Sequence, residues 1–443
     1  MKRIFLILTT SLVCMNIHAQ DSATLTLTLD KAIEIAMSES QTIKLAEKEI
    51  ERVDYSKQSA WQGLIPTLTA SGQFEKYLAA PTMSLGSTLI EMPTNYNASA
   101  GISLSLPLFA PALWQSIKMT ALDMQLAVEK AQASKITLRN DVSKAFYGIL
   151  LAKDSYKTLQ AGLKLAEDMY EQTKKRFENG LVSEFDVISA EVQVQNLKPT
   201  ILEVENGIEQ AKMFLKVLIG IEMAQAIDVQ GVLTDYENVV SANAQMNLAV
   251  DGNTDLKQLD IQQQLLQKSL SIQRTQRMPT LAAFGNFGHN WTRNNSSVNF
   301  ITQQLDPASS SNYGQGLLAG LQLSVPLTGI FTNISKEKQT KVQMDQLSLQ
   351  RDYLESSLNV QAQSAYNMMT VAKNQAEAAQ KNSELAQRGY DIATKRYETG
   401  MGIMLEVQNA SNQLMQAQLS YHQSIVDYLN AKSDLEKLLG ITE

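Results

Sequence analysis

Two short stretches of the chain, 220 residues apart, place a carboxylate six positions after a glycine. The first reads RFENGLVSEFDV at 176–187, and the second reads RYETGMGIMLEV at 396–407. The carboxylates are Asp186 and Glu406. Their chemistry is electrostatic, because a carboxylate near a helix start offsets the free backbone amides there and a gathered set of carboxylates attracts cations. Both residues are therefore candidate functional groups.

Each glycine in these stretches is predicted to end a helix. Gly180 and Gly400 follow runs that close with Lys and Arg, and glycine fits the left-handed position after a helix C-terminus. In the first stretch, Ser183 and Asp186 have the spacing of a capping box for the next helix. In the second, Gly402 is expected to take the N-cap position without a side chain. The two stretches therefore predict two helix–turn–helix hairpins.

The residue types needed for other chemistries are sparse. Apart from the first nineteen residues, the chain has His289 and His422, far apart in sequence, and no cysteine. This predicts no metal site, no cofactor and no enzyme, since no phosphate-binding loop or nucleophile motif accompanies them. A net charge of −7 argues against nucleic acid. The 18 methionines leave copper or silver export as an alternative, although packing also accounts for them.

The first nineteen residues are predicted to be a signal peptide. Lys2 and Arg3 precede a short apolar run, and Ala19 completes a small-residue cleavage site. Lipidation of Cys14, the single cysteine, is the rival interpretation. No later segment has 18 consecutive apolar residues, so we expect no transmembrane helix. An exported chain of this kind is either soluble or crosses a membrane as β-strands.

Two long stretches without proline, 112–198 and 327–443, are predicted to form the helices that carry the turns. Within 112–152 apolar residues recur with a 4-3-4-3 spacing, which is typical of helices that supercoil with neighbours. The run from about residue 113 to the first turn would extend roughly 100 Å as a helix. Such a length indicates a rod of packed helices.

The proline-containing windows have the period of β-strands instead. In ASAGISLSLPLF and AGLQLSVPLTG, aliphatic residues alternate with small or polar residues, as expected for a transmembrane strand, although a half-buried soluble sheet has the same pattern. The chain therefore consists of one plan used twice, with a linking segment. A signal peptide is predicted at 1–19 and a connecting segment at 221–251. The first repeat is predicted at 20–220, with strands at 66–77 and 98–109 and a turn near 180. The second repeat is predicted at 252–443, with strands at 279–288 and 316–328 and a turn near 400.

Four transmembrane strands are too few to close a barrel. An open sheet edge in lipid leaves unpaired backbone groups, so the chain is expected to share a barrel with copies of itself. Two copies would supply eight strands, whose interior fills with side chains. Three copies would supply twelve, which is wide enough for a lumen.

The chain resembles the TolC-type outer-membrane efflux proteins. The resemblance rests on the duplicated helix–strand–strand–helix plan, the strand ends SLPLF and SVPL, the pair RFENGLVSEFDV and RYETG, and the closing SDLEKLLGIT. It implies an internally duplicated α+β membrane protein with four transmembrane β-strands per chain in a trimeric 12-stranded β-barrel, continued by a long periplasmic α-helical coiled-coil barrel. The implied function is the exit duct of a tripartite efflux or type I secretion system.

The resemblance also implies partners and a location. The partners would be two further copies of the chain, a periplasmic adaptor protein, an inner-membrane transporter that supplies the energy, and outer-membrane lipid. The location would be the outer membrane of a Gram-negative bacterium, with a large periplasmic part. A trimeric coiled-coil structural or adhesive protein and a soluble periplasmic helical enzyme remain the alternatives, and the sequence does not identify an exported substrate.

Finally, the resemblance implies roles for the turn residues. Asp186, Glu406 and Tyr397 match positions at a periplasmic gate, where a trimer would gather six carboxylates. Gly402 and Asn409 replace polar gate residues of the family, which predicts a looser gate. Apolar residues at exposed turns suggest contact with the adaptor, although packing between hairpins is the plainer explanation. The predicted turn contacts are Gly180, Leu181, Val182, Gly400, Met401 and Ile403.

Overall fold

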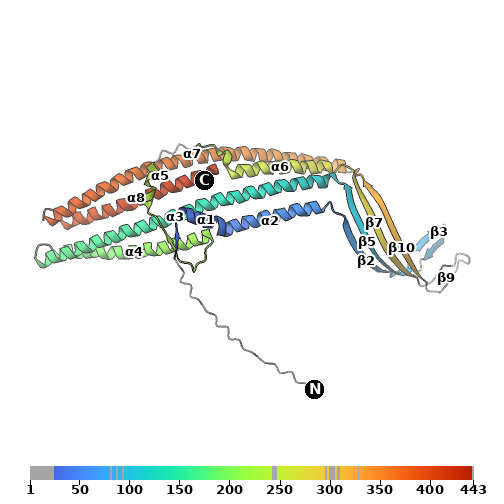
Figure 1. Cartoon of the computed structure of the whole chain (residues 1–443), viewed down its shortest axis with the longest axis horizontal. Helices are drawn as coiled ribbons and strands as arrows, with labels where there is room; N and C mark the ends of the chain where they lie inside the picture. The colour runs from blue at the N-terminus through green and yellow to red at the C-terminus, as the bar shows by residue number, and fades with distance from the viewer. Residues whose placement is uncertain are drawn as a thin grey trace, which may run out of the picture. The chain divides into compact units, whose positions relative to one another are not determined.

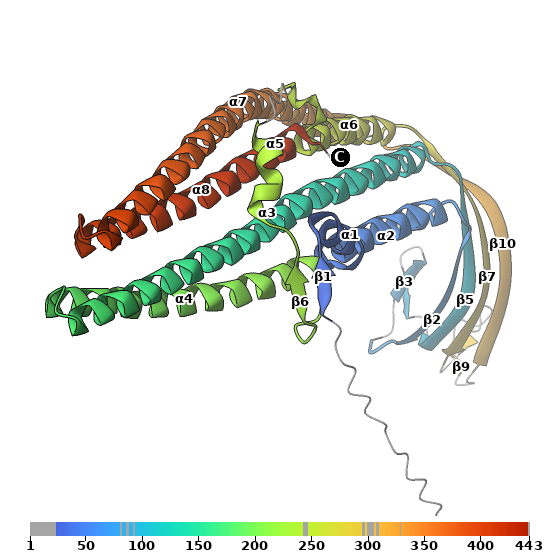
Figure 2. The same cartoon turned by 60° about the vertical axis from the view of Figure 1, so that its left-hand side comes forward.

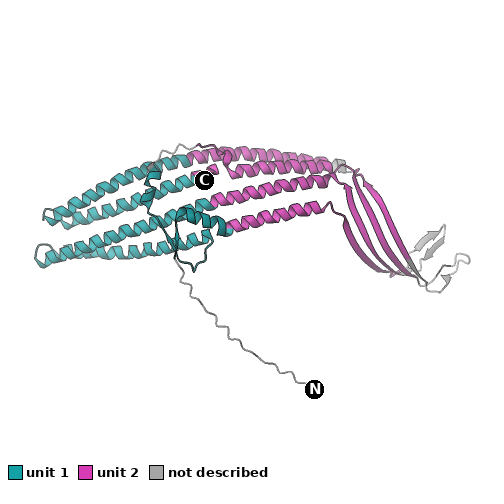
Figure 3. Cartoon of the chain, viewed as in Figure 1, with its two compact units in different colours: residues 1–41, 138–245, 365–434 teal, residues 42–137, 246–364, 435–443 magenta. Residues whose placement is uncertain are grey.

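The computed structural model describes most of the chain as two compact units (Figure 3). Unit 1 comprises residues 1–41, 138–245 and 365–434, and unit 2 comprises residues 42–137, 246–364 and 435–443. The predicted signal peptide lies outside the described residues. These are 24–79, 82–85, 88–91, 94–241, 247–294, 297–298, 305–306, 310–327 and 329–441.

Unit 2 contains a four-stranded antiparallel sheet of order β10-β7-β5-β2 (Figure 2). Its centre joins the two repeats, because β5 pairs with β7 through residues such as Ile102 opposite Phe287. The edges are β2 and β10. The strands are β2 (Thr67–Lys76), β5 (Thr94–Phe109), β7 (Thr280–Asn294) and β10 (Ser310–Ser324).

Three strands extend further into polar sequence than the alternation predicted. β7 runs to Asn294 instead of 288, β10 begins at Ser310 instead of 316, and β5 begins at Thr94 instead of 98. The ladder between β7 and β10 continues through these residues, because backbone pairing does not require apolar side chains. β10 ends at Ser324, before the predicted end at 328, where Pro326 lacks a donor for the ladder.

Short strand pairs also occur between the two predicted strands of each repeat. They are β3 (Thr82–Leu85) with β4 (Thr88–Glu91), and β8 (Ser297–Val298) with β9 (Leu305–Asp306).

The long strands expose an aliphatic face. Ile102 and Leu104 in β5, and Leu321 and Leu323 in β10, are all exposed, and each alternates with a small or polar neighbour. This is the residue pattern of a strand that faces lipid. Among the described residues, no helix is both long enough and apolar enough to cross a membrane.

Helices adjoin the sheet at one end of each long strand in unit 2 (Figure 1). Polar pairs hold α6 against the start of α7, including Arg351 Nε to Asp260 Oδ1 at 2.7 Å and Gln273 Nε2 to Thr340 Oγ1 at 2.8 Å. These helices are α2 (Gln41–Gln62), the start of α3 (Pro111–Glu178), α6 (Thr254–Thr275) and the start of α7 (Gly329–Glu398).

Unit 1 contains the two helical hairpins, α3 with α4 (Glu184–Ile219) and α7 with α8 (Met404–Leu439), whose turns lie at the same end of the unit (Figures 1 and 2). The connecting segment contacts both hairpins. Leu233 N donates to Asp154 of α3 at 2.9 Å, and Tyr421 of α8 donates to Glu237 at 2.6 Å. The smaller elements are β1 (Leu25–Leu27), which pairs with β6 (Ile227–Val229), α1 (Leu29–Glu39), η1 (Leu233–Tyr236) and α5 (Glu237–Ser241), with η2 (Val250–Gly252) in unit 2.

Candidate functional site at the hairpin turns

The first turn ends α3 with a left-handed glycine. Gly180 has a φ of 71°, and its N–H donates to Phe177 O at 2.8 Å. The next residue, Leu181, donates to Arg176 O at 2.9 Å. This pair of bonds satisfies carbonyls that the helix end would otherwise leave free, so the glycine explains the sharp stop.

The side chain of Asp186 is used to start α4. Ser183 is the N-cap, and Asp186 N donates to its Oγ at 3.3 Å. In return, Asp186 Oδ2 accepts from Ser183 N at 3.0 Å and from Ser183 Oγ at 2.7 Å. This is the capping box predicted from the sequence. One oxygen of the predicted gate carboxylate therefore has a local structural role.

The second turn has the same backbone and a different start to the following helix. Gly400 has a φ of 75°, and Met401 N donates to Arg396 O at 2.8 Å. α8 begins at Met404, so the residue before the helix is Ile403. The prediction that Gly402 takes the N-cap position is wrong by one residue, because the 220-residue offset aligns Ser183 with Ile403. Isoleucine offers no capping oxygen.

Glu406 lies beside a cation of its own turn. Its Oε2 is 3.4 Å from Arg396 Nη1, and Arg396 Nη2 donates to Met401 O at 3.3 Å. The carboxylate and guanidinium are at ion-pair distance, yet Glu406 Oε2 accepts no hydrogen bond from the described residues. Since both side chains are about half exposed, this pair contributes little stability.

Tyr397 lies in a buried cluster between the hairpins and is 3% exposed. Its hydroxyl is 3.2 Å from Oγ1 of Thr173, a fully buried residue of α3. The Thr173 hydroxyl gives its proton to Met169 O at 2.8 Å, so Tyr397 donates to Thr173. The described contacts of Tyr397, a predicted gate residue, are therefore packing contacts within one chain. The cluster consists of Met169, Ala190, Tyr397, Met404 and Val407.

Arg176 links the two turns, a contact that the sequence did not predict. Its Nη1 donates to Tyr397 O at 2.9 Å, and its Nη2 donates to Glu398 O at 3.0 Å. The guanidinium also lies 4.5 Å from the centre of the Tyr397 ring. Arg176 thus caps the C-terminal end of α7 from the other hairpin and stacks on its aromatic ring. The repeated Arg–aromatic pair in RFENG and RYETG is the feature of the sequence that could have indicated this contact.

Apolar side chains are exposed around both turns. Leu181 is 73% exposed, Met401 70% and Ile403 61%, while Val182 is half-buried. Phe185, which the sequence reasoning missed, is 75% exposed. Large apolar side chains gathered at an exposed turn indicate a contact surface for another molecule.

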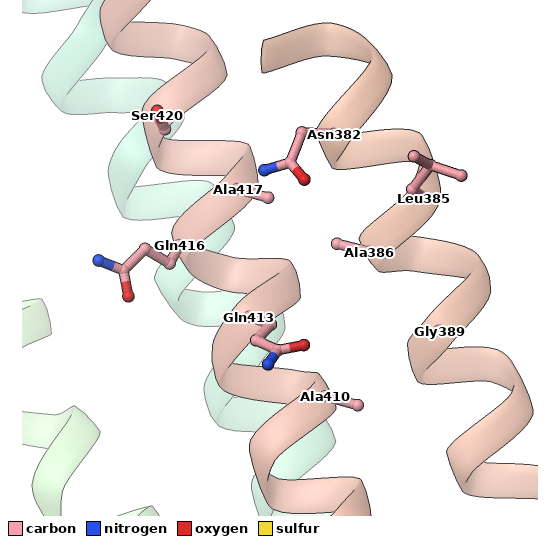
Figure 4. A pocket seen from close by; sticks show the side chains of 9 residues that line it. All are labelled: Asn382, Leu385, Ala386, Gly389, Ala410, Gln413, Gln416, Ala417 and Ser420. Carbon is pink, nitrogen blue, oxygen red and sulfur yellow. The ribbon is translucent and has the colours of Figure 1, made fainter. Parts of the chain in front are cut away.

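A groove of about 610 Å³ lies between α7 and α8 in unit 1 (Figure 4). Many of its lining side chains are short, and its hydrogen-bonding groups are three carboxamides and the hydroxyl of Ser420. No group of three or more potential metal ligands occurs in the part of the chain that the structure describes. The groove is lined by Asn382, Leu385, Ala386, Gly389, Ala410, Gln413, Gln416, Ala417 and Ser420.

The arrangement of helical hairpins and a four-stranded antiparallel sheet defines the fold of outer-membrane efflux channels. The crystal structure of the outer membrane protein VceC from Vibrio cholerae matches with a TM-score of 0.72 at 14% identity, over 93% of this chain and 96% of that one. The model of the outer membrane efflux protein family matches residues 32–221 and 246–441, so the chain belongs to this family. The resemblance seen in the sequence is confirmed.

Two curated relatives agree with this assignment. Outer membrane protein TolC of Vibrio cholerae serotype O1 is 23% identical over 346 residues, which cover 77% of this chain and 76% of the relative. Outer membrane protein TolC of Escherichia coli K12 is 25% identical over 353 residues, which cover 78% and 70%. The protein is an outer-membrane efflux channel of a Gram-negative bacterium, with a large periplasmic part. This confirms the predicted outer-membrane channel.

Proposed function

We propose that the protein works as a homotrimer that passively conducts substrates across the outer membrane. The proposal rests on the family match over both repeats and on the open edges of the sheet, since β2 and β10 each pair on one side only among the described residues. Open edges in lipid are costly, and pairing β10 of one copy with β2 of the next satisfies them. Three copies give a 12-stranded β-barrel with a lumen, continued by the helices as an α-helical coiled-coil barrel.

The trimer has a direct test. Protein extracted in detergent should have the mass of three chains and should conduct ions in a planar bilayer. A monomer that neither assembles nor conducts would contradict the proposal.

The second part of the proposal is that the channel is the exit duct of a tripartite efflux or type I secretion system. The exposed Leu181, Met401 and Ile403 would contact the tip of a periplasmic adaptor, with Gly180, Val182 and Gly400 shaping the turns. An inner-membrane transporter would supply the energy. Replacing Met401 and Ile403 with serine should weaken co-purification with the adaptor, whereas serine at exposed Leu349, far along α7, should not.

The third part is a periplasmic gate. Asp186 and Glu406 would contribute six carboxylates around the axis of a trimer, close to Tyr397, and would favour cations. The Asp186→Ala, Glu406→Ala double variant should lose cation selectivity in single-channel recordings. A Glu184→Ala, Glu398→Ala variant removes the same charge from exposed neighbouring positions and serves as the control. Unchanged conductance and selectivity in the first variant would refute the carboxylate ring.

A further inference from the structure

The ends of the helices that adjoin the sheet of unit 2 are strongly basic, although the chain as a whole is acidic. The whole chain has 38 Lys and Arg against 45 Asp and Glu. The sheet-proximal windows 55–65, 110–122, 269–279 and 329–341 contain seven basic residues and one acidic residue, Glu337, an excess of six positive charges. We call the basic set the collar. It consists of Lys57, Lys118, Arg274, Arg277, Lys336, Lys338 and Lys341.

Most of the collar is available to a ligand. The single carboxylate is already engaged, because Glu337 is paired with Arg277 and lies 3.7 Å from Arg274. Four lysines of the collar are exposed and have no ion-pair partner among the described residues. Unpaired cations near the sheet-proximal ends of two helices, α3 and α7, raise the local positive potential and attract anions. The four are Lys118, Lys336, Lys338 and Lys341.

Two tryptophans lie at the same sheet-proximal helix ends as the collar. The chain has three tryptophans. Trp61, near the end of α2, is 51% exposed, and Trp114, near the start of α3, is 48% exposed. The two helix ends are adjacent, because a Cβ at Gly63 would lie 3.0 Å from Leu113 Cδ1. Exposed indoles are favoured at the level of lipid headgroups, where an apolar ring with one polar edge fits the boundary.

The spacing joins the two kinds of residue. Lys57 is four residues before Trp61, and Lys118 is four residues after Trp114, so each lysine shares a helix face with its tryptophan. In both helices the tryptophan lies nearer to the sheet and the lysine one turn further away. This order matches the surface of a membrane, where tryptophan rings lie at the edge of the apolar layer and the phosphates of the lipid headgroups lie further out, within reach of lysine.

We propose that the collar binds the phosphate of anionic phospholipid headgroups on the periplasmic side of the outer membrane, with Trp61 and Trp114 fixing the depth. The proposal rests on the proposed function, in which the sheet spans that membrane. It identifies a lipid-recognition surface for this chain, distinct from the turns that face a protein partner. The aliphatic sheet face next to the collar favours a lipid over a soluble anion as the occupant.

Native mass spectrometry of the full-length protein in detergent tests the proposal. The protein is incubated with phosphatidylglycerol or phosphatidylcholine of the same chain length, and retained lipid is counted. Phosphatidylglycerol should be retained about tenfold more strongly, since each lysine near a headgroup contributes to the attraction. Replacing Lys118, Lys336, Lys338 and Lys341 with glutamine should abolish this preference. The matched control replaces four exposed lysines away from the sheet, Lys135, Lys164, Lys381 and Lys395.

Three outcomes would overturn the lipid site. They are equal retention of the two lipids by the wild type, equal loss in the control variant, and displacement of phosphatidylglycerol by soluble glycerol phosphate at equal concentration. A second readout uses bromine-labelled lipids, which should quench Trp61 and Trp114 in a Trp291→Phe variant. Planar-bilayer conductance reports the proposed function separately, so a protein that conducts without lipid preference refutes only the collar.

Discussion

The two hairpin turns have the same backbone and different side-chain partners. Both helices stop at a left-handed glycine, and both following helices carry a carboxylate in the first turn. In the first turn that carboxylate completes a capping box. In the second, Glu406 faces Arg396 instead, and Ile403, directly before the helix, has no side-chain oxygen that could cap it. Duplication has kept the fold of the turn, while the interactions that hold it have diverged.

The arginines at equivalent positions differ in the same way. Arg396 contacts its own turn, whereas Arg176 reaches across to the carbonyl groups of Tyr397 and Glu398. The first turn is therefore self-sufficient, and the second is held by the first. We infer that if a gate opens by movement of one hairpin, α7–α8 is the one that moves.

The largest effect is expected for Arg176→Ala. The variant loses two charge-assisted hydrogen bonds and the stacking on Tyr397, which should destabilise the end of α7 by about 2 kcal/mol after allowance for partial exposure. Hydrogen exchange of amides 395–402 should accelerate by about 30-fold. Arg396→Ala, the equivalent change, should accelerate it by no more than about threefold. Equal acceleration of exchange in the two variants would contradict the inferred difference between the two arginines.

The Tyr397 hydroxyl should give the next largest effect. Tyr397→Phe removes the hydrogen bond that the buried Thr173 hydroxyl accepts, while its bond to Met169 O remains, and this loss should cost about 1 kcal/mol. A double-mutant cycle with Thr173→Val isolates this coupling in denaturant unfolding of the detergent-solubilised protein. Phe177→Tyr, at the equivalent position of the first repeat, adds a hydroxyl to a partly exposed ring and should change little. Additive effects of the two single changes would mean that the hydroxyls do not interact.

Exchanging the caps sharpens the comparison. Ser183→Ala should destabilise the start of α4 by about 1 kcal/mol, and Ile403→Ser should stabilise the start of α8 by about 0.5 kcal/mol. The gain follows because Glu406 already occupies the position of a capping-box partner. Hydrogen exchange of the first turns of α4 and α8 measures both changes. A loss of protection at α8 in Ile403→Ser would show that the exposed isoleucine stabilises the turn in another way.

The smallest effect is the pH dependence that His422 contributes in the second repeat. Burial lowers the pKa of His422 below its ordinary 6.5, with Asp154 opposing and Lys157 reinforcing the shift. The folded state therefore disfavours the protonated imidazole, so stability is present above pH 6.5 and decreases as the pH falls from 6.5 toward the lowered folded value. The melting temperature should fall less between pH 7.5 and 5.5 in His422→Gln. The equivalent residue is Leu202, which does not titrate.

The sequence was sufficient for features determined by local chemistry. The glycines, the Ser183 capping box and the strand alternation each depend on a few neighbouring residues, and the structure contains all three. The Arg176 bridge could not be predicted, because it depends on how two segments 221 residues apart pack. The same limit applies to Tyr397, whose burial depends in part on Met169 and Ala190 of the other hairpin. The N-cap error at Gly402 arose because glycine is a frequent cap, whereas the position is set by the backbone of the turn.

The pairing of β5 with β7 has a consequence for symmetry. It joins the two repeats by the same antiparallel backbone bonds that we propose between chains, from β10 to β2. In the proposed trimer, six strand pairs would then alternate around a ring with near-sixfold order, although only three chains are present. A partner with six equivalent contacts would meet hairpin turns of two kinds in alternation. Such a partner would contact three capped α3–α4 turns and three uncapped α7–α8 turns. It could therefore move the α7–α8 hairpins while the α3–α4 hairpins stay in place.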